Sequence, residues 1–229
     1  MTILPVNPTD NATPEALRAF LEQCAAVAAQ ANQPQLVSIS MAVDSLDPLA
    51  VLESIFEPSQ VHFYAERPAQ GFGVAGAEAM LQGSFTGPAR FAEAKAFIEQ
   101  TLKNTIAVGP VGENFGGPHF FLLGGFAHDA PRAAPFPPLR VFVPRWQVSR
   151  MGDGSVAVAN VFIGPGLPLD AIAEKLWKAH AKFRAFDNRT ATNRDRPSAP
   201  KRIEEMGPAG GYQAAVAQAL KEIARGDYE

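Results

Sequence analysis

Residues 37–44 read Val-Ser-Ile-Ser-Met-Ala-Val-Asp, and this stretch decides the class of fold. Its large apolar side chains fall on the odd positions, and small or polar side chains fall on the even ones. Alternation with a period of two is typical of a strand with one buried face. The sequence therefore predicts a sheet that contains this segment.

Helices are predicted on both sides of this strand. Upstream, Thr13 can cap a helix over 14–30, Pro14 suits its first position, and apolar residues that include Cys24 recur at helical spacing. Downstream, Asp47 and Pro48 open a short helix that runs to about residue 56.

The rest of the chain alternates irregularly between the two kinds of pattern. One or two strands broken by glycines are predicted over 72–85. Other strands are predicted over 61–66, 120–127, 139–150 and 155–163, the last two as a hairpin. Further helices are predicted from Pro88 to about Thr105, over 169–183 and over 212–225.

This order of elements predicts an α+β fold with a largely antiparallel sheet and helices packed on one side. Strict alternation of strand and helix, which would indicate a parallel sheet, is absent from the pattern. We expect residues 1–229 to form a single domain, with a polar linker over 186–207 before the final helix.

Composition excludes several classes of protein. The 229 residues are 47% hydrophobic and 19% charged with a net charge of −3, which indicates neither a disordered chain nor a strongly basic nucleic-acid binder. The single cysteine excludes an intrachain disulfide and a four-cysteine metal site. Without a leader pattern or an apolar run of about 18 residues, we expect a cytoplasmic protein with no membrane span.

Two glycine-rich stretches invite a phosphate-binding interpretation. Gly71-Phe-Gly73-Val-Ala-Gly76 has the letters of a dinucleotide fingerprint, but Gly83, Gly87 and Pro88 leave no room for the long helix that must follow. A glycine-kinked strand is the favoured interpretation. The second stretch, 109–118, could cradle an anion through backbone N–H groups, but it lacks the Gly-Lys-Ser/Thr ending of a P-loop. A flexible connection is favoured there.

Histidines and serines show no catalytic or metal-binding spacing. His62, His119, His128 and His180 share no metal-ligand spacing, and His180 falls on the apolar side of its helix. His128-Asp129 indicates a turn at a strand end rather than an oriented base. No serine lies in a Gly-x-Ser-x-Gly pattern. The residues alone therefore predict no catalytic, cofactor-binding or metal-binding side chain.

One segment is asymmetric in charge. Residues 175–202 contain nine basic and two acidic residues, a local balance of +7. Phosphate neutralisation on a nucleic acid is one interpretation, but the segment lacks interleaved exposed aromatic residues and half of it is linker. A solvated face, or a surface that docks an acidic partner domain, is favoured, and no nucleic-acid partner is expected.

Several segments together resemble the N-terminal portion of isochorismate synthases, in the larger family of chorismate-utilising enzymes. Val61-His-Phe-Tyr-Ala-Glu-Arg-Pro68, with the following Gly71 and Val74-Ala-Gly76, resembles an aromatic-rich strand of that family and its turn. Leu123-Gly-Gly-Phe-Ala-His-Asp129 and Val141-Phe-Val-Pro-Arg145 resemble two later strands. Order and spacing agree, and the resemblance covers the chain from about Leu36 onward.

The resemblance implies that catalysis belongs to a chorismate-binding domain beyond the final helix. In that family a lysine there activates the water that attacks chorismate, and glutamates hold Mg²⁺. None of those positions lies in residues 1–229. It therefore implies a non-catalytic scaffolding domain whose partner is the catalytic domain, with Mg²⁺ only in the full-length enzyme, and leaves open whether the pathway makes menaquinone, phylloquinone or a siderophore.

Other functions stay open at this point. A sheet face left uncovered by the catalytic domain would expose an apolar patch, so self-association is expected. The same face could instead make the chain a stand-alone, non-enzymatic module that binds a small molecule or a partner. Within the enzyme class, anthranilate and aminodeoxychorismate synthases are the nearest rivals, and a Leu-Leu-Glu-Ser motif of the kind that accompanies tryptophan feedback is absent.

Overall fold

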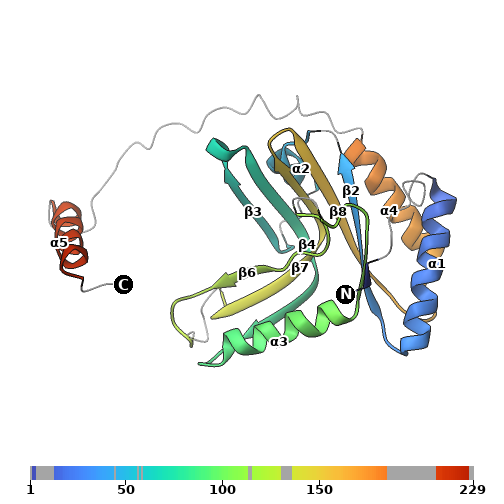
Figure 1. The fold of residues 1–229 in the computed structure, drawn as a ribbon, viewed down its shortest axis with the longest axis horizontal. Coiled ribbons are helices and arrows are strands. Elements are labelled where there is room, and N and C mark those ends of the chain that lie inside the picture. The colour runs from blue at the N-terminus through green and yellow to red at the C-terminus, as the bar shows by residue number, and fades with distance from the viewer. Residues whose placement is uncertain are drawn as a thin grey trace. The chain divides into compact units, whose positions relative to one another are not determined.

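The computed structural model describes residues 2–3, 13–43, 45–55, 57, 59–112, 115–129, 136–184 and 210–226. The chain divides into two compact units, residues 1–191 and residues 192–229, and each is described by itself. The first unit contains a twisted sheet with helices against it (Figure 1).

Eight strands are described in the sheet. In chain order they are β1 (Thr2–Ile3), β2 (Gln35–Val43), β3 (His62–Arg67), β4 (Phe72–Phe85), β5 (Thr105–Val108), β6 (Phe121–Gly124), β7 (Leu139–Met151) and β8 (Gly154–Ile163). Their spatial order is β1-β5-β2-β8-β7-β4-β3, and β6 pairs with β7. Only the β1–β5 and β2–β5 pairs are parallel among the described strands. The predicted α+β fold with a largely antiparallel sheet is confirmed.

The helices lie where the apolar periodicity predicts them. The first unit has α1 (Pro14–Ala31), α2 (Pro48–Ile55), α3 (Arg90–Lys103), α4 (Leu169–Arg184) and the single 3₁₀ turn η1 (Pro68–Gln70), and the second unit has α5 (Gly211–Arg225). Thr13 caps α1 as expected, because its Oγ1 accepts a hydrogen bond from the Ala16 amide at 3.2 Å. None of the described helices has the length and apolar character that crossing a membrane requires.

Two short strands were not predicted. The helix predicted from Pro88 to about Thr105 ends at its cap residue Asn104. The chain then continues as β5, which pairs with both β1 and β2. All four residues of β5 are buried, so its sequence has no alternation that would indicate a strand. β1 is only two residues long, too short for any periodic pattern.

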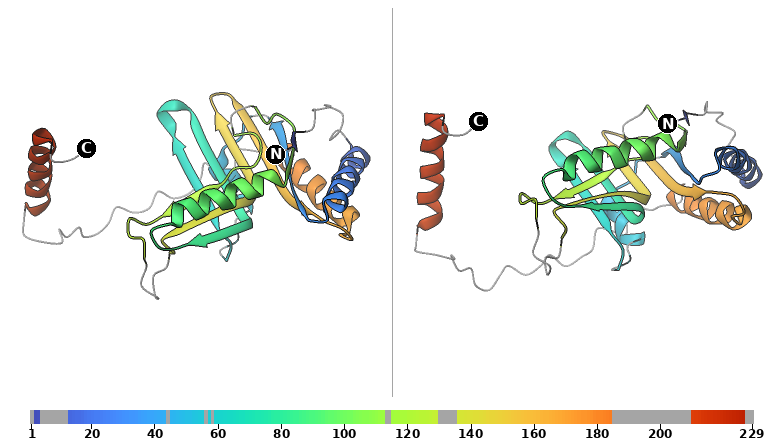
Figure 2. Two further views of the ribbon diagram at one scale, coloured as in Figure 1. Left: turned by 60° about the horizontal axis from the view of Figure 1, so that its bottom comes forward. Right: turned by 90° about the horizontal axis from the view of Figure 1, so that it is seen from below.

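One face of the sheet forms the main core. Val37 of β2 lies opposite Val161 of β8, and Ile39 lies opposite Ala159, which in turn lies opposite Trp146 of β7. These side chains pack with buried residues of α1 and α4, and Figure 2 shows the two helices side by side. The main apolar cluster is therefore a helix pair on a sheet face.

The opposite face of β2 is also buried, so the prediction of a single buried face is wrong. Ser38 and Ser40 are 0% and 2% exposed, on the face away from α1 and α4. In β2 the apolar residues line one buried face of the strand and the polar residues line a second buried face, so the alternation does not mark a solvent-exposed face.

The long β4–β7 pair extends the sheet beyond the part that is buried on both faces. A bulge between Ala79 and Leu81 shifts its register, and Glu78 just before it has a φ of +58°. The Glu78 carboxylate accepts a hydrogen bond from the Arg145 guanidinium at 2.7 Å, which ties the bulge to β7. Beyond the bulge, α3 packs its Ala94 on β7 in a separate apolar cluster.

Leu21 of α1 provides a direct test of the main core. Its side chain is fully buried, so Leu21→Ala leaves a cavity and should lower the free energy of unfolding by about 3 kcal/mol. Val27 lies on the same helix but is 43% exposed, and Val27→Ala should cost less than about 1 kcal/mol. Urea unfolding followed by tryptophan fluorescence measures both, and equal losses would contradict this core.

Candidate functional site

Four buried polar side chains of the sheet lie together on the face opposite α1 and α4. Ser38 of β2 lies directly opposite Asn160 of β8, while Ser40 and Gln147 of β7 both lie opposite Val158. The four polar side chains are between 0% and 2% exposed. We call these four residues the polar row. Polar groups so far from water need hydrogen-bond partners within the protein.

A connection between β5 and β6 supplies part of those partners. We call residues 109–119 the strap. The Gly117 amide donates a hydrogen bond to Ser40 Oγ at 2.7 Å, and Gln147 Nε2 donates to the Phe115 carbonyl at 3.0 Å. The Phe115 ring also lies 5.1 Å from the ring of Phe72 on β4. The strap, expected to be a flexible connection, is thus bonded to the sheet through its described residues; Glu113 and Asn114 lie outside them.

Glycine is required at two points of the strap. A Cβ on Gly109, whose φ is +96°, would lie 1.9 Å from the Ser40 carbonyl oxygen. A Cβ on Gly116 would lie 2.0 Å from the Pro110 carbonyl oxygen. The glycines therefore let the strap approach the sheet and fold on itself. The strap leads to strand β6 and not to a helix N-terminus, so it has no P-loop geometry.

Three oxygens of the polar row have no partner among the described residues. They are Ser38 Oγ, Gln147 Oε1 and Asn160 Oδ1. Asn160 is held through its other end, because Nδ2 donates to the Pro144 carbonyl at 2.8 Å. The amide oxygens can only accept, so this face has an excess of acceptors and would pair with hydroxyl or N–H donors. It offers no described carboxylate or thiol for acid–base or nucleophilic chemistry.

His119 closes the end of the strap. Its Nδ1 lies 3.1 Å from the Gly117 carbonyl oxygen and 3.3 Å from Gln147 Nε2, and its ring lies 4.9 Å from that of Phe115. When Nδ1 carries a proton it donates to the Gly117 carbonyl, and it then cannot accept a hydrogen bond from Gln147 Nε2. The neutral ring therefore makes only one of these two hydrogen bonds at a time. Burial lowers the pKa of His119, which favours the neutral form.

The other histidines are scattered. His62 is exposed on β3 with Nδ1 3.3 Å from the Gln60 carbonyl oxygen, and His128 pairs with Asp129 at 3.1 Å in the turn after β6. His128 and Asp129 lie in a bend that begins after the end of β6. The side chain of His180 lies outside the described residues. No three His, Cys, Asp or Glu side chains of the described ranges gather into a metal site.

The fingerprint-like glycines form a strand, as expected. Gly71 ends η1 with a φ of +62°, and Gly73 and Gly76 lie within β4. A Cβ on Gly76 would lie 3.1 Å from Pro144 and 3.2 Å from Phe121, so this glycine allows close packing between neighbouring strands. These glycines hold strands together and leave no loop for a pyrophosphate.

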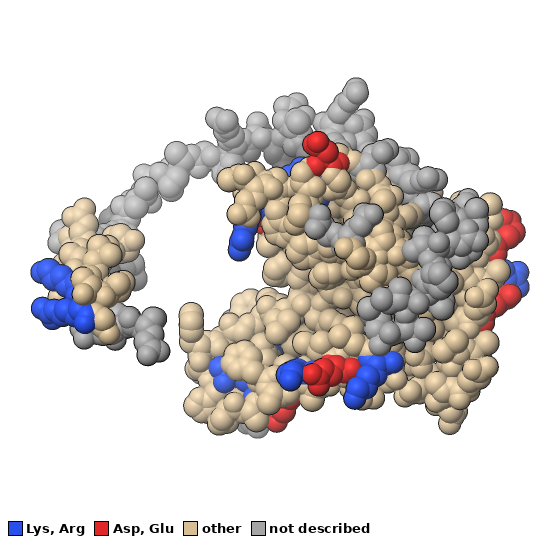
Figure 3. Space-filling model, in the orientation of Figure 1, with Lys and Arg blue, Asp and Glu red and all other residues tan. Residues whose placement is uncertain are grey.

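Only the first part of the basic segment can be placed. In α4, Lys178 forms an ion pair with Glu174 at 2.6 Å, with both side chains exposed. The remainder, including the expected linker over 186–207, lies outside the described residues. On the face of the first unit shown in Figure 3, acidic and basic side chains are interspersed rather than gathered by sign.

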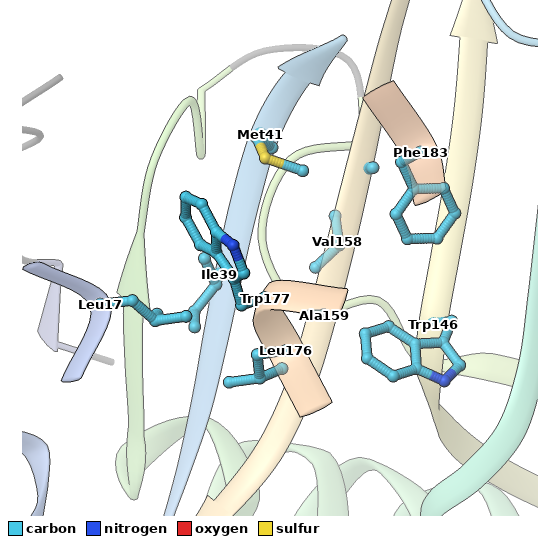
Figure 4. A pocket seen from close by; sticks show the side chains of 10 residues that line it. Leu17, Ile39, Met41, Trp146, Val158, Ala159, Leu176, Trp177 and Phe183 are labelled. Atoms are coloured by element: carbon cyan, nitrogen blue, oxygen red, sulfur yellow. The ribbon is translucent and has the colours of Figure 1, made fainter. Parts of the chain in front are cut away.

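An apolar pocket that the sequence did not predict lies between the helix pair and the sheet. Figure 4 shows Trp146, Trp177 and Phe183 around it, with Met41 and Leu17 at its sides. Its volume of about 40 Å³ is far below the roughly 300 Å³ of a small-molecule site. The pocket is a gap between large aromatic side chains, and we assign it no ligand.

The fold and these contacts define a mixed-sheet domain with a polar interior face. The family described as chorismate binding enzyme matches residues 19–229. Because that match spans most of the chain, the chain belongs to the chorismate-binding enzyme family. Among curated proteins, no match to the chain is found.

Acidification should weaken the fold through His119. The pKa of His119 in the folded chain lies below the ordinary value of 6.5. At pH values well above 6.5 the ring is neutral in both the folded and the unfolded chain, so its titration does not change the free energy of unfolding. As the pH falls below 6.5, the unfolded chain is protonated first, and the free energy of unfolding decreases.

The variant His119→Gln should lose this part of the decrease, measured by urea unfolding near neutral pH and about two pH units lower. His128→Gln is the matched control, because that ring is 56% exposed. An unchanged pH dependence in His119→Gln would exclude the strap histidine as its source.

Proposed function

We propose that the unit of residues 1–191 is the non-catalytic scaffold of an isochorismate synthase. One observation supports this most. The three segments that resemble isochorismate synthases, spread over 61–145, each contribute residues to strands β3, β4, β6 or β7, which are neighbours in the sheet. A resemblance that arose by chance would have no reason to gather on adjoining strands.

Phe121, two residues before the segment 123–129, joins the other two segments. Its ring centre lies 4.6 Å from that of Phe63 and 5.6 Å from that of Phe142. Gly76 packs against both Pro144 and Phe121. These contacts make one packed unit in which the contacting residues have a steric role. Such a role suits a scaffold, since none of the contacting side chains carries acid–base or nucleophilic chemistry.

The described residues do not fit the Mg²⁺ of the resembling enzymes. Mg²⁺ takes oxygen ligands, usually one or two carboxylates with waters and substrate oxygens. In the polar row the available oxygens belong to neutral amides and hydroxyls. The half-buried carboxylate of Glu78 already forms an ion pair with Arg145. We derive no step through the metal, and we propose that the catalytic groups belong to the chorismate-binding domain that partners this scaffold.

A stand-alone binding module is the second candidate, and the polar row favours it. Three buried oxygens that lack a partner among the described residues would meet the hydroxyl or N–H groups of a small molecule if the strap moved. Calorimetric titration with chorismate separates the two: saturable heat favours the module, and its absence favours the scaffold.

The purified 229-residue chain should convert no chorismate when Mg²⁺ is supplied, since the described residues provide no acid–base pair beside a metal site. Incubation followed by mass spectrometry for isochorismate, anthranilate and aminodeoxychorismate checks this. A complete isochorismate synthase assayed in parallel verifies the substrate and the detection. Isochorismate that accumulates in proportion to the added chain would refute the scaffold role.

The sequence predicts self-association through an uncovered sheet face, and we propose α5 as a further surface through which the chain self-associates. Within its unit, this helix leaves an apolar stripe exposed: Tyr212 is 75%, Leu220 60% and Ile223 57% exposed. Sedimentation velocity should show dimers or larger species as protein concentration rises, and Leu220→Lys should reduce them. Gln218→Lys adds the same charge outside the stripe and should leave the association unchanged. A monomer at every concentration would contradict the proposal.

A further inference from the structure

Arg90 is a buried cation that has no anionic partner among the described residues. It is the first residue of α3 and is only 9% exposed. Nη1 lies 3.4 Å from the Gly87 carbonyl oxygen and Nη2 lies 3.5 Å from the Phe126 carbonyl oxygen, which are long contacts for a guanidinium. In the described ranges Nε has no acceptor, and no carboxylate forms an ion pair with Arg90. A buried charge of this kind is unfavourable until it is paired.

The N-terminus of α3 adds positive potential at the same place. Ala89 occupies the cap position and has no side chain that could accept from the first-turn amides. The helix is 14 residues long, so its dipole places a partial positive charge at this end. The two features are independent, and both call for an anion.

Nearby acids do not supply this anion. Asp129 follows the turn that carries Phe126, but its carboxylate pairs with His128. Glu93 lies in the first turn of α3 and is exposed. Neither is found paired with Arg90. The described part of the chain therefore supplies no counter-charge for Arg90.

An exposed aromatic ring lies against the cation. Arg90 Cζ lies 4.4 Å from the centre of the Phe91 ring, and Phe91 is 56% exposed. Phe126, whose carbonyl contacts Arg90, is fully exposed, so its ring is open to a ligand. Isolated exposed apolar residues are ordinary, but these two phenylalanines offer stacking surface near a guanidinium that has no anion among the described residues.

We propose that Gly87, Arg90, Phe91 and Phe126 form a binding site for a small aromatic carboxylate. The carboxylate would pair with the Arg90 fork and face the α3 amides, and its ring would contact both Phe91 and Phe126. A planar carboxylate matches the guanidinium through two parallel hydrogen bonds, which a chloride ion cannot make. This site is separate from the polar row, and the proposal does not depend on the scaffold role.

Titration of the full chain with sodium benzoate, followed by backbone amide NMR, tests the proposal. The amides of Phe91 and Ala92 should shift saturably, and sodium chloride at equal ionic strength should not reproduce the shift. Arg90→Met keeps an apolar stem and should weaken benzoate at least tenfold. Lys103→Met removes an exposed cation from the other end of α3 and should bind benzoate as the wild type does.

Phe126→Ala removes a ring that makes no buried contact, so it keeps the test valid if Arg90→Met fails to fold. It should weaken benzoate several-fold and leave inorganic phosphate unaffected. Phosphate that binds as tightly as benzoate would overturn the aromatic part of the proposal. No saturable shift in the wild type, or an equal shift in Arg90→Met, would overturn the site.

Discussion

The hydrogen bond from the Gly117 amide to Ser40 Oγ is the contact on which the arrangement of the sheet depends. It fixes the strap against β2 at 2.7 Å, and a second bond, from Gln147 to the Phe115 carbonyl, fixes the strap against β7. Between these strands lies β8, with Asn160 fully buried. A sheet with amide and hydroxyl groups on one face could not keep them from water without a cover that also bonds to them.

Different interactions therefore stabilise the two faces of the sheet: apolar burial on one face and hydrogen bonds on the other. On the α1–α4 face, side chains such as Leu21 and Val37 contribute through burial of apolar area, which is non-directional and tolerates adjustment. On the polar face, each contact has a required distance and direction, and glycine is needed where the backbone comes closest. The second kind of packing specifies the path of the strap more narrowly than apolar contact alone would.

Sequence patterns were sufficient to predict elements whose apolar residues repeat with a single helical or strand period. The α1 pattern and its Thr13 cap, the 37–43 alternation and the turn between β7 and β8 were found because each is set by local neighbours. β5 was missed because both of its faces are buried, which removes the alternation. The polar row was missed for a related reason: Ser38 and Ser40 look like a solvent face until Asn160 and Gln147, more than 100 residues away, are brought beside them. Arg90 gave no signal either, since a helical arginine is ordinarily exposed.

The polar row also bears on why the domain has this interior. Ser40 and Gln147 are needed for the fold, because the strap is bonded to both of them. The oxygens of Ser38, Gln147 and Asn160 that lack a partner among the described residues make no comparable contact, and apolar side chains of similar size would avoid their desolvation penalty. The polar row therefore contains two kinds of polar group: those that fix the path of the strap, and those whose burial lowers the stability of the unit without a described contact.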